Sequence, residues 1–594
     1  MKKKLLVLGV LTTMLLAGCG GSNDQAGTDG GKAKPTTFVM GTSNFNGDFY
    51  DGWTNSSYDA NIRRLVWGGG LLAPTDKGEF VLNTFVESRT MSKSDPSKEV
   101  NDIWTFKIKD GMKFSNGDPL TAKDVKFTFD FYLDKKALQD TGATTNLPDY
   151  ISEVTIDEKE NTVTFNLKKV PYAIDSAVFL TFILDSSDIA PKAKEAGLTP
   201  QQYVKANMST PIGYGPYKID EYVESQYVKL SINENFQGNF EGQKPHIPTI
   251  IAQNVPEETK ITQLTSGEID GLTGLVSEDN IDAAKNDQDL STNNYYRHGG
   301  GQITFHTDFG ATQLPEVRKA FAYEFDRIKF RNLFLGKYGI ASNAPYSRNM
   351  WMMYDAGEKL GEEGKFEKSL TSYDLVTADG KWDETANLAE AHRLLDQAAS
   401  RTDGAYAKLT KKGNKYMWEG KELLINLAIT SAWTDAINLT LTKEVQNKFG
   451  IKVNVDSMDW SIMANNLYGN APASERKYNA FTGGTSYSLQ YDPYASWSKT
   501  QILPFGQGSS SNTSRYVGDE DLLAKIRFAN SSTEEGQEQY KENWRKWIVE
   551  VNKDLPLLPL YSNNYYDAYT NRVVNFETNA LWQWPYAIVK AEYK

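Results

Sequence analysis

Alternating apolar and polar positions in the first half of the chain predict strands on either side of one helix. Trp104, Phe106 and Ile108 alternate with polar residues, which is typical of a half-buried strand. Thr121 and Asp124 then have the spacing of a capping box, which predicts the start of a helix. A second alternating run follows a polar turn further along. This half of the chain is therefore expected to be mixed α and β.

The clearest unit is a strand, a helix and a second strand within residues 423–455. The first seven residues are almost all apolar, as in a strand buried on both faces. Thr434 can cap a helix whose apolar residues recur at helical spacing from 437 to 449, so the crossover predicts a parallel sheet. Ligands bind beyond the carboxyl ends of strands in such sheets, which makes Trp433 a candidate contact. A further helix is expected over residues 315–328.

The amino terminus has the pattern of an export signal followed by a tether. Three lysines precede an apolar run at 5–16, which is too short for a membrane span of about 20 residues. The run ends before Cys19, which is the only cysteine in the chain and the expected site of a thioether-linked lipid. We therefore expect a signal peptide at 1–18 and a lipidated, disordered tether at 19–36.

Composition describes a large, acidic and aromatic protein. A chain of 594 residues is too long for one compact core, and the lack of a low-complexity linker after Pro35 predicts lobes that are interleaved in sequence. The net charge of −12 argues against nucleic acid as a partner. The 13 Trp, 32 Tyr and 27 Phe residues suit both a large core and a cleft that grips ligands by flat apolar faces.

Motifs for catalysis, nucleotides and metals are weak. The chain has neither a P-loop nor a Gly-x-Ser-x-Gly elbow, and its four histidines lack the spacing of a zinc helix. We therefore expect no catalytic residues, no metal site and no cofactor. Carboxylates are plentiful, so a glycosidase pair stays open, because such pairs have no fixed spacing in sequence.

Several stretches, taken in order, resemble the solute-binding lipoproteins of oligopeptide ABC transporters, in particular the Gram-positive type. The longest is WTFKIKDGMKFSNGDPLTAKDV at 104–125. Further matches span nearly the whole chain after the tether, and they are the strand at 162–167, PIGYGPY at 211–217, SGEID at 266–270, and the segments 315–327, 388–395 and 572–582.

This resemblance implies an α/β fold of two hinged lobes, like a periplasmic binding protein, with an extra α+β subdomain in the first lobe. Lobe I would comprise 37–78, 206–300 and 555–594, the extra subdomain 79–205, and lobe II 301–554. The protein would be a receptor that binds oligopeptides between its lobes and delivers them to a separate ABC permease and its ATPase. We expect it to act as a monomer.

The family's wall for the ligand chain is similar to residues 487–493. Many members place a carboxylate four residues before the proline of this wall, to pair the α-ammonium group of the peptide, but this chain has Leu489 there. Either Asp492 or another acid takes that role, or the peptide amino terminus is not fixed. The candidate cleft residues are Trp433, Tyr487, Gln490, Asp492 and Trp497. For each the alternative is packing, and for Asp492 a turn before Pro493.

Two other functions stay open at this point. The same fold could bind an oligosaccharide or a chelated metal, because abundant Trp and Tyr suit stacking on sugars. A protein of another class, a secreted glycoside hydrolase, would also have this size, acidity and aromatic content.

Overall fold

A computed structural model describes residues 34–54, 56–143, 145–488 and 490–594. The predicted signal peptide, most of the predicted tether, and Cys19 lie outside the described residues. Thr36–Lys594 forms one compact unit. In the part of the chain that is described, no helix combines the length and the apolar character that a membrane crossing requires.

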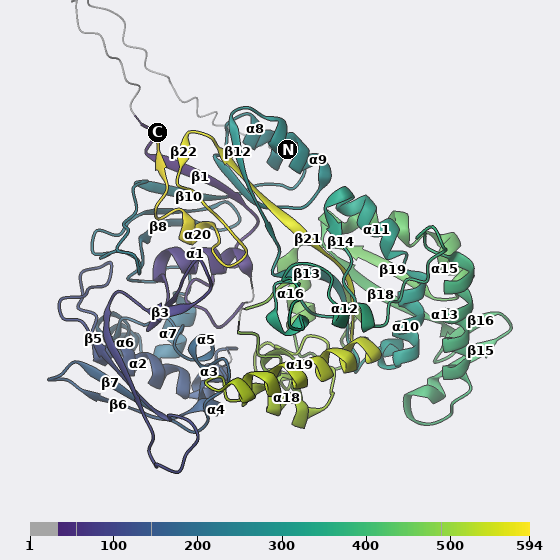
Figure 1. Ribbon diagram of the computed structural model, residues 1–594, viewed down its shortest axis with the longest axis horizontal. Helices are drawn as coiled ribbons and strands as arrows, with labels where there is room; N and C mark the ends of the chain where they lie inside the picture. Colours follow the sequence, from purple (N-terminus) through teal and green to yellow (C-terminus); the bar gives the residue numbers. More distant parts are fainter. Residues whose placement is uncertain (1–33, 55, 144, 489) are drawn as a thin grey trace, which may run out of the picture. The chain divides into compact units, whose positions relative to one another are not determined.

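One mixed sheet runs through this unit (Figure 1). Its strands follow the spatial order β19 (Lys452–Ser457), β18 (Leu424–Ile429), β20 (Ala480–Ser486), β13 (Gly299–Phe305), β21 (Leu557–Thr570), β11 (Gly271–Leu275), β1 (Thr37–Thr42), β10 (Thr249–Asn254), β9 (Tyr227–Ile232) and β8 (Tyr217–Val223). β12 (Leu290–Tyr296) and β14 (Gly339–Ile340) also pair with β21. β18 is parallel to β19, as its crossover predicts, and β8 and β9 form a hairpin.

A second, antiparallel sheet belongs to the predicted extra subdomain. Its order is β4 (Val86–Ser92), β5 (Ile103–Ile108), β7 (Thr162–Leu167) and β6 (Ile151–Asp157). β5 buries Trp104, Phe106 and Ile108, so the alternating pattern is confirmed. The helix α2 (Ala122–Leu133) packs on β6 and β7, and both bonds of its capping box, between Thr121 and Asp124, are present.

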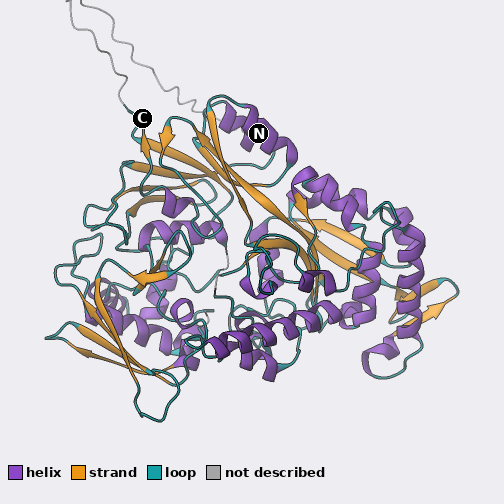
Figure 2. Cartoon of the chain, viewed as in Figure 1, coloured by secondary structure: helices purple, strands orange, loops and turns teal. Residues whose placement is uncertain are grey.

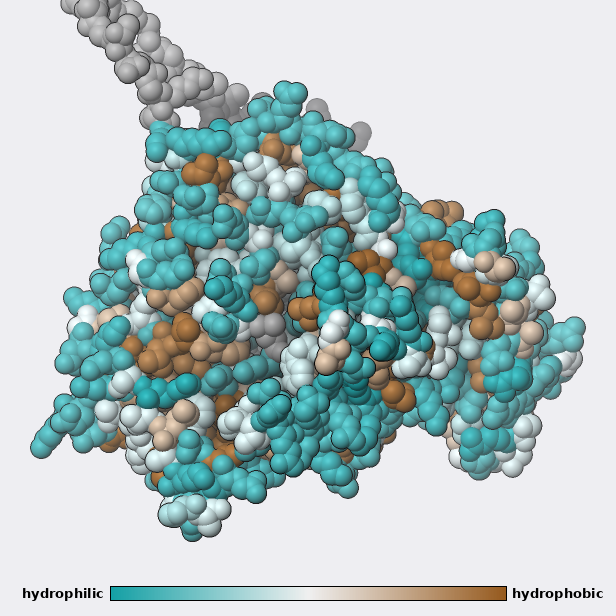
Figure 3. Space-filling view, viewed as in Figure 1, coloured by the Kyte–Doolittle hydropathy of each residue, from teal (hydrophilic) through white to brown (hydrophobic). Residues whose placement is uncertain are grey.

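The remaining larger helices lie around the two sheets (Figure 2). They are α1 (Ser57–Trp67), α6 (Ser186–Glu195), α7 (Pro200–Ala206), α9 (Glu278–Asn286), α10 (Pro315–Glu324), α11 (Arg327–Phe334), α13 (Glu384–Ala399), α14 (Thr434–Thr440), α15 (Lys443–Phe449), α16 (Trp460–Tyr468), α18 (Glu520–Arg527) and α19 (Glu534–Asp554). Figure 3 shows a mostly hydrophilic face with hydrophobic residues in small groups.

Apolar side chains gather in two main cores, which define two lobes. The first core takes residues from Phe38 to Ala252 and again from Val573 to Tyr593. The second takes residues from Ile303 to Tyr561, together with an adjoining cluster built around α18 and α19. The first lobe therefore contains both the beginning and the end of the described chain, as expected of lobes that are interleaved in sequence. β21 pairs with strands of both lobes.

Two predicted helices are wrong in their extent. The helical pattern at 434–449 is split into α14 and α15, because the Thr442 side chain accepts a hydrogen bond from the Val445 amide and caps a new helix there. Thr434 is the first residue of α14, and the preceding N-cap position is Trp433, whose side chain makes no capping bond. Likewise α10 ends at Glu324, since Asp326 accepts from the Lys329 amide and caps α11. In both cases a short polar side chain interrupts an apolar face that continues in sequence.

Candidate functional site

In the large sheet, β20 runs beyond its neighbour β18. β20 pairs with β13 along its whole length, but with β18 only at Ala480 and Phe481. No strand of the described chain pairs with the other edge of β20 from Thr482 to Ser486. Gly484, Ser486 and Ser488 are exposed here. The edge of β20 from Thr482 to Ser486 thus lacks a strand partner within the described chain.

Tyr487 and Gln490 lie in the segment that follows this free edge. The Tyr487 amide donates to the carbonyl of His298 at 2.8 Å, and its ring packs edge-on against His298 and Tyr491. Gln490 reaches the first lobe, where its Oε1 accepts from the Ser176 hydroxyl at 3.4 Å. Leu489 lies outside the described residues.

Asp492 lies at the turn before α17 (Tyr494–Trp497). Its carboxylate accepts from the Tyr494 amide at 3.1 Å and lies 3.3 Å from Nε of Arg527. Burial raises the pKa of Asp492 to about 7, even though two backbone N–H groups favour its charged form. This carboxylate therefore supports the turn before α17 while it faces Arg527.

The two predicted tryptophans are buried in the second core. Trp433 stacks on Phe334 and Phe330 at ring distances of 5.0 and 5.5 Å, and it adjoins Tyr561. Trp497 donates from its indole nitrogen to the Tyr491 hydroxyl at 3.1 Å. The structure thus gathers Tyr487, Gln490, Asp492 and Trp497 along one segment, whereas Trp433 belongs to the packing behind Tyr561.

Arg297, which the sequence patterns did not single out, lies between β12 and β13. Its guanidinium lies over the ring of Tyr565 at 4.8 Å, and its Nη2 donates to the carbonyl of Thr485 at 3.3 Å. The Tyr561 hydroxyl is a further hydrogen-bonding partner. The side chain of Arg297 is only 6% exposed, and its Nε has no hydrogen-bond partner among the described residues. A buried cation therefore lies over the backbone of β20 at Gly484 and Thr485.

A second contact between the lobes lies at the extra subdomain. The Tyr172 amide donates to the carbonyl of Arg527 at 2.7 Å, and the Tyr172 ring stacks on Tyr540 at 3.9 Å. The Arg527 guanidinium lies between Tyr150 of the subdomain and Tyr494 of the second lobe, at 4.4 and 4.3 Å. These contacts hold the two lobes together in the arrangement described.

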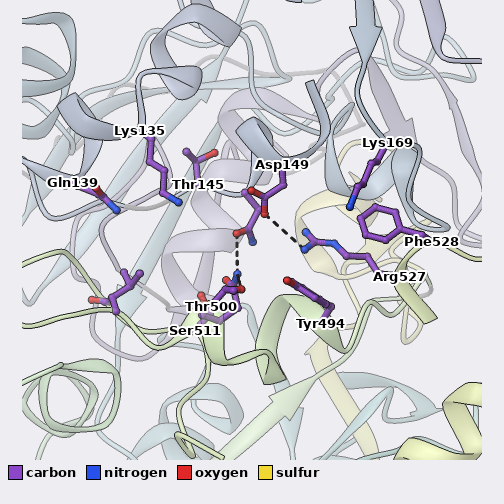
Figure 4. Close-up of a pocket in the computed structure, with 14 residues that line it drawn as sticks. Lys135, Gln139, Thr145, Asp149, Lys169, Tyr494, Thr500, Ser511, Arg527 and Phe528 are labelled. Atoms are coloured by element: carbon purple, nitrogen blue, oxygen red, sulfur yellow. Dashed lines mark hydrogen bonds and ion pairs between the residues drawn. The ribbon is translucent and has the colours of Figure 1, made fainter. Parts of the chain in front are cut away.

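The same contact encloses a polar cavity of about 330 Å³ (Figure 4). Lys135 and Lys169 approach it from the subdomain, while Thr500 and Ser511 approach it from the second lobe. Two bonds cross it, from Gln501 to Asn146 at 3.2 Å and between Arg527 and Asp149 at 3.8 Å. The cavity leaves room for water or for a polar part of a ligand.

No cluster of three or more His, Cys, Asp or Glu residues suited to a metal ion occurs within the described ranges. We therefore assign no metal ligands.

The chain is similar in sequence to a known family of proteins. The model of the family described as bacterial extracellular solute-binding proteins, family 5 Middle, matches residues 92–501. A curated relative, the oligopeptide-binding protein AppA of Bacillus subtilis, is 24% identical over 579 residues, which cover 95% of this chain and 94% of AppA.

Solved structures share the fold. The structure of AppA from Bacillus subtilis in complex with a nonapeptide has a TM-score of 0.73 and 20% identity, and the match covers 94% of this chain and 99% of AppA. That of NikZ from Campylobacter jejuni in complex with Ni(L-His) has a TM-score of 0.71 and 17% identity, and the match covers 94% and 99% of the two chains. The predicted two-lobed α/β fold with an extra subdomain is thereby confirmed.

Proposed function

Because this chain belongs to the bacterial extracellular solute-binding proteins of family 5, we propose that it binds oligopeptides and delivers them to an ABC permease. The family consists of binding proteins that act outside the cytoplasm, so the prediction of a receptor without catalysis is confirmed. The alternative of a secreted glycoside hydrolase is excluded by the same membership.

The free edge of β20 is the observation that carries the choice of peptides. An extended peptide can pair its main-chain N–H and C=O groups with an unpaired strand edge, whatever its side chains are. Gly483 and Gly484 keep side chains away from this edge, and the space beside Gly483 is open. AppA, which is similar over nearly the whole chain, is named an oligopeptide-binding protein, and its structure holds a nonapeptide.

We retain Tyr487, Gln490 and Asp492 as proposed ligand contacts, because their segment adjoins both the free edge and the first lobe. Trp433 and Trp497 remain proposals that compete with their observed packing. The proposed lobe limits are 37–78, 206–300 and 555–594 for lobe I, 79–205 for its extra subdomain and 301–554 for lobe II. The two cores support the division between the lobes, except that Leu555, Leu558, Leu560 and Tyr561 belong to the second core.

Ligand titration tests the proposed function. The intrinsic fluorescence of the purified protein should change saturably with a degenerate pool of peptides of four to nine residues, and mass spectrometry should recover those peptides uncut. Oligosaccharides and nickel–histidine, the ligand bound in the NikZ structure, serve as parallel arms. Saturation by either of these without any response to peptides would refute the proposed cargo, and cleavage of a peptide would refute a pure binding role.

We also propose that the protein is a monomer anchored to the outer face of the cell membrane by a lipid on Cys19. The position of this sole cysteine after a short apolar run supports the anchor. Cys19→Ala is expected to abolish incorporation of labelled palmitate and to release the protein from the membrane fraction. Retention of label by this variant would contradict the anchor, and a dimer in sedimentation velocity would contradict the monomer.

A further inference from the structure

Arg297 forms no ion pair among the described residues, whereas two other deeply buried arginines do. Arg327 is paired with Asp374 at 2.8 Å, and Arg527 with Asp492 at 3.3 Å. Arg318 also lacks an ion pair in the described part of the chain, but its Nε and both Nη atoms donate to backbone carbonyls. Within the described ranges, no Asp or Glu forms an ion pair with Arg297. The groups that contact its guanidinium are the ring of Tyr565, the Tyr561 hydroxyl and one carbonyl.

Such an environment is costly for a cation. Removing a guanidinium from water is unfavourable unless charge and hydrogen bonds replace the lost hydration. A tyrosine ring offsets only a small part of this cost. The Nε hydrogen has no acceptor among the described residues. The guanidinium therefore retains both an unused donor and an unbalanced charge.

The guanidinium also lies close to the exposed backbone of β20. A Cβ atom added at Gly484 would lie 2.7 Å from its Nη2, although Gly484 is an exposed residue of β20. The absence of a side chain at 484 thus leaves room for the cation directly over the backbone of β20. Tyr565 comes from the long strand β21, and its ring lies 4.8 Å from the guanidinium and covers one side of the cation.

We propose that Arg297 binds a carboxylate of the ligand, so that the receptor prefers peptides that present one at the free edge of β20. The guanidinium fork suits the two oxygens of a carboxylate, and such charge-assisted bonds are about twice as strong as neutral ones. The carboxylate comes from the peptide carboxyl terminus or from an Asp or Glu side chain. This inference rests on the proposed peptide-binding function and specifies what its peptides carry.

Four peptide pools separate the two sources of the carboxylate. All have the same lengths, and they combine the presence or absence of Asp and Glu with a free or an amidated carboxyl terminus. The full chain is titrated with each pool. The pool without any carboxylate is expected to bind at least ten-fold more weakly than the best pool. The two intermediate pools show whether the protein recognises the carboxyl terminus of the peptide or its Asp and Glu side chains.

Variants then assign the preference to Arg297. Arg297→Gln should reduce the ten-fold difference to less than two-fold, while Arg297→Lys, which keeps the charge but loses the fork, should retain part of it. Arg393→Gln is the matched control, because Arg393 is exposed on α13, where it pairs with Glu390, and it should leave the preference unchanged. Thermal melts verify that each variant is folded. If Arg297→Gln does not fold, the wild-type pools and Arg297→Lys still decide the outcome.

The possible failures are distinct. Equal binding of all four pools by the wild type overturns the role of Arg297 and leaves peptide binding intact. A preference that persists in folded Arg297→Gln also overturns it, and a preference in Arg297→Lys equal to that of the wild type overturns the recognition by a guanidinium fork. Absence of binding by every pool overturns the proposed function, and this inference with it.

Discussion

Replacing Arg327 by alanine is expected to lower the free energy of unfolding by about 3–5 kcal/mol, because it breaks a buried ion pair from one side. The side chains of Arg327 and Asp374 are 1% and 9% exposed, and two nitrogens of Arg327 bind both oxygens of Asp374 at 2.8 and 3.1 Å. The guanidinium also donates to the carbonyls of Ser342 and Pro559. Alanine would leave a carboxylate and two carbonyls without these partners.

Urea unfolding followed by fluorescence measures this loss. Arg393→Ala is the control, since its pair with Glu390 is solvated, with the arginine 57% exposed, and pairs of this kind contribute about 0–1 kcal/mol. Adding Asp374→Ala to Arg327→Ala should recover part of the lost stability, because it removes the unpaired carboxylate. A loss below 1 kcal/mol in Arg327→Ala would show that the buried pair does not stabilise this lobe.

Trp433→Ala is expected to cost about 3–5 kcal/mol of stability, the usual range when a large aromatic side chain is removed from a core. Its ring lies against Phe334, Phe330 and Tyr561, so truncation leaves a void between three aromatic rings. The same substitution should also weaken peptide binding by about 1–3 kcal/mol if the ring is a central ligand contact.

Separate measurements distinguish these two effects. Stability is followed by thermal or urea unfolding, and affinity is measured at a temperature where the variant is fully folded. Trp433→Phe serves as the milder variant, because it keeps an aromatic ring in the stack. A destabilised variant with unchanged affinity would remove Trp433 from the ligand-binding residues, whereas unchanged stability would contradict the packing argument.

Local patterns predicted the elements that depend on local sequence. The strand at Trp104 to Ile108 and the capping box of Thr121 were recognisable because their determinants lie within a few residues of each other. The parallel pairing of β18 and β19 followed from the length of the crossover. The break at Thr442 was missed, because a cap inside a continuous apolar pattern looks like an ordinary polar position of a helix.

The candidate site depended on contacts that are distant in sequence. Arg297 is a single residue whose burial arises from Thr485 and Tyr565, far along the chain, so no local pattern marks it. The burial of Glu324 could not be predicted for a different reason. It lies in a helix with a recognised apolar face, yet it is fully buried, and burial raises its pKa well above the usual range. The extent of an apolar face is decided by the lobe that surrounds it.

Because the lobes are interleaved in sequence, their cores can be completed only in one order. The second core is built from one uninterrupted stretch, from Ile303 to Tyr561. The first core includes Val573 to Tyr593, next to residues that begin with Phe38. During export from the amino terminus, the earlier lobe must therefore wait for the last residues to emerge. The first lobe, whose residues emerge first, is therefore the last to complete its core.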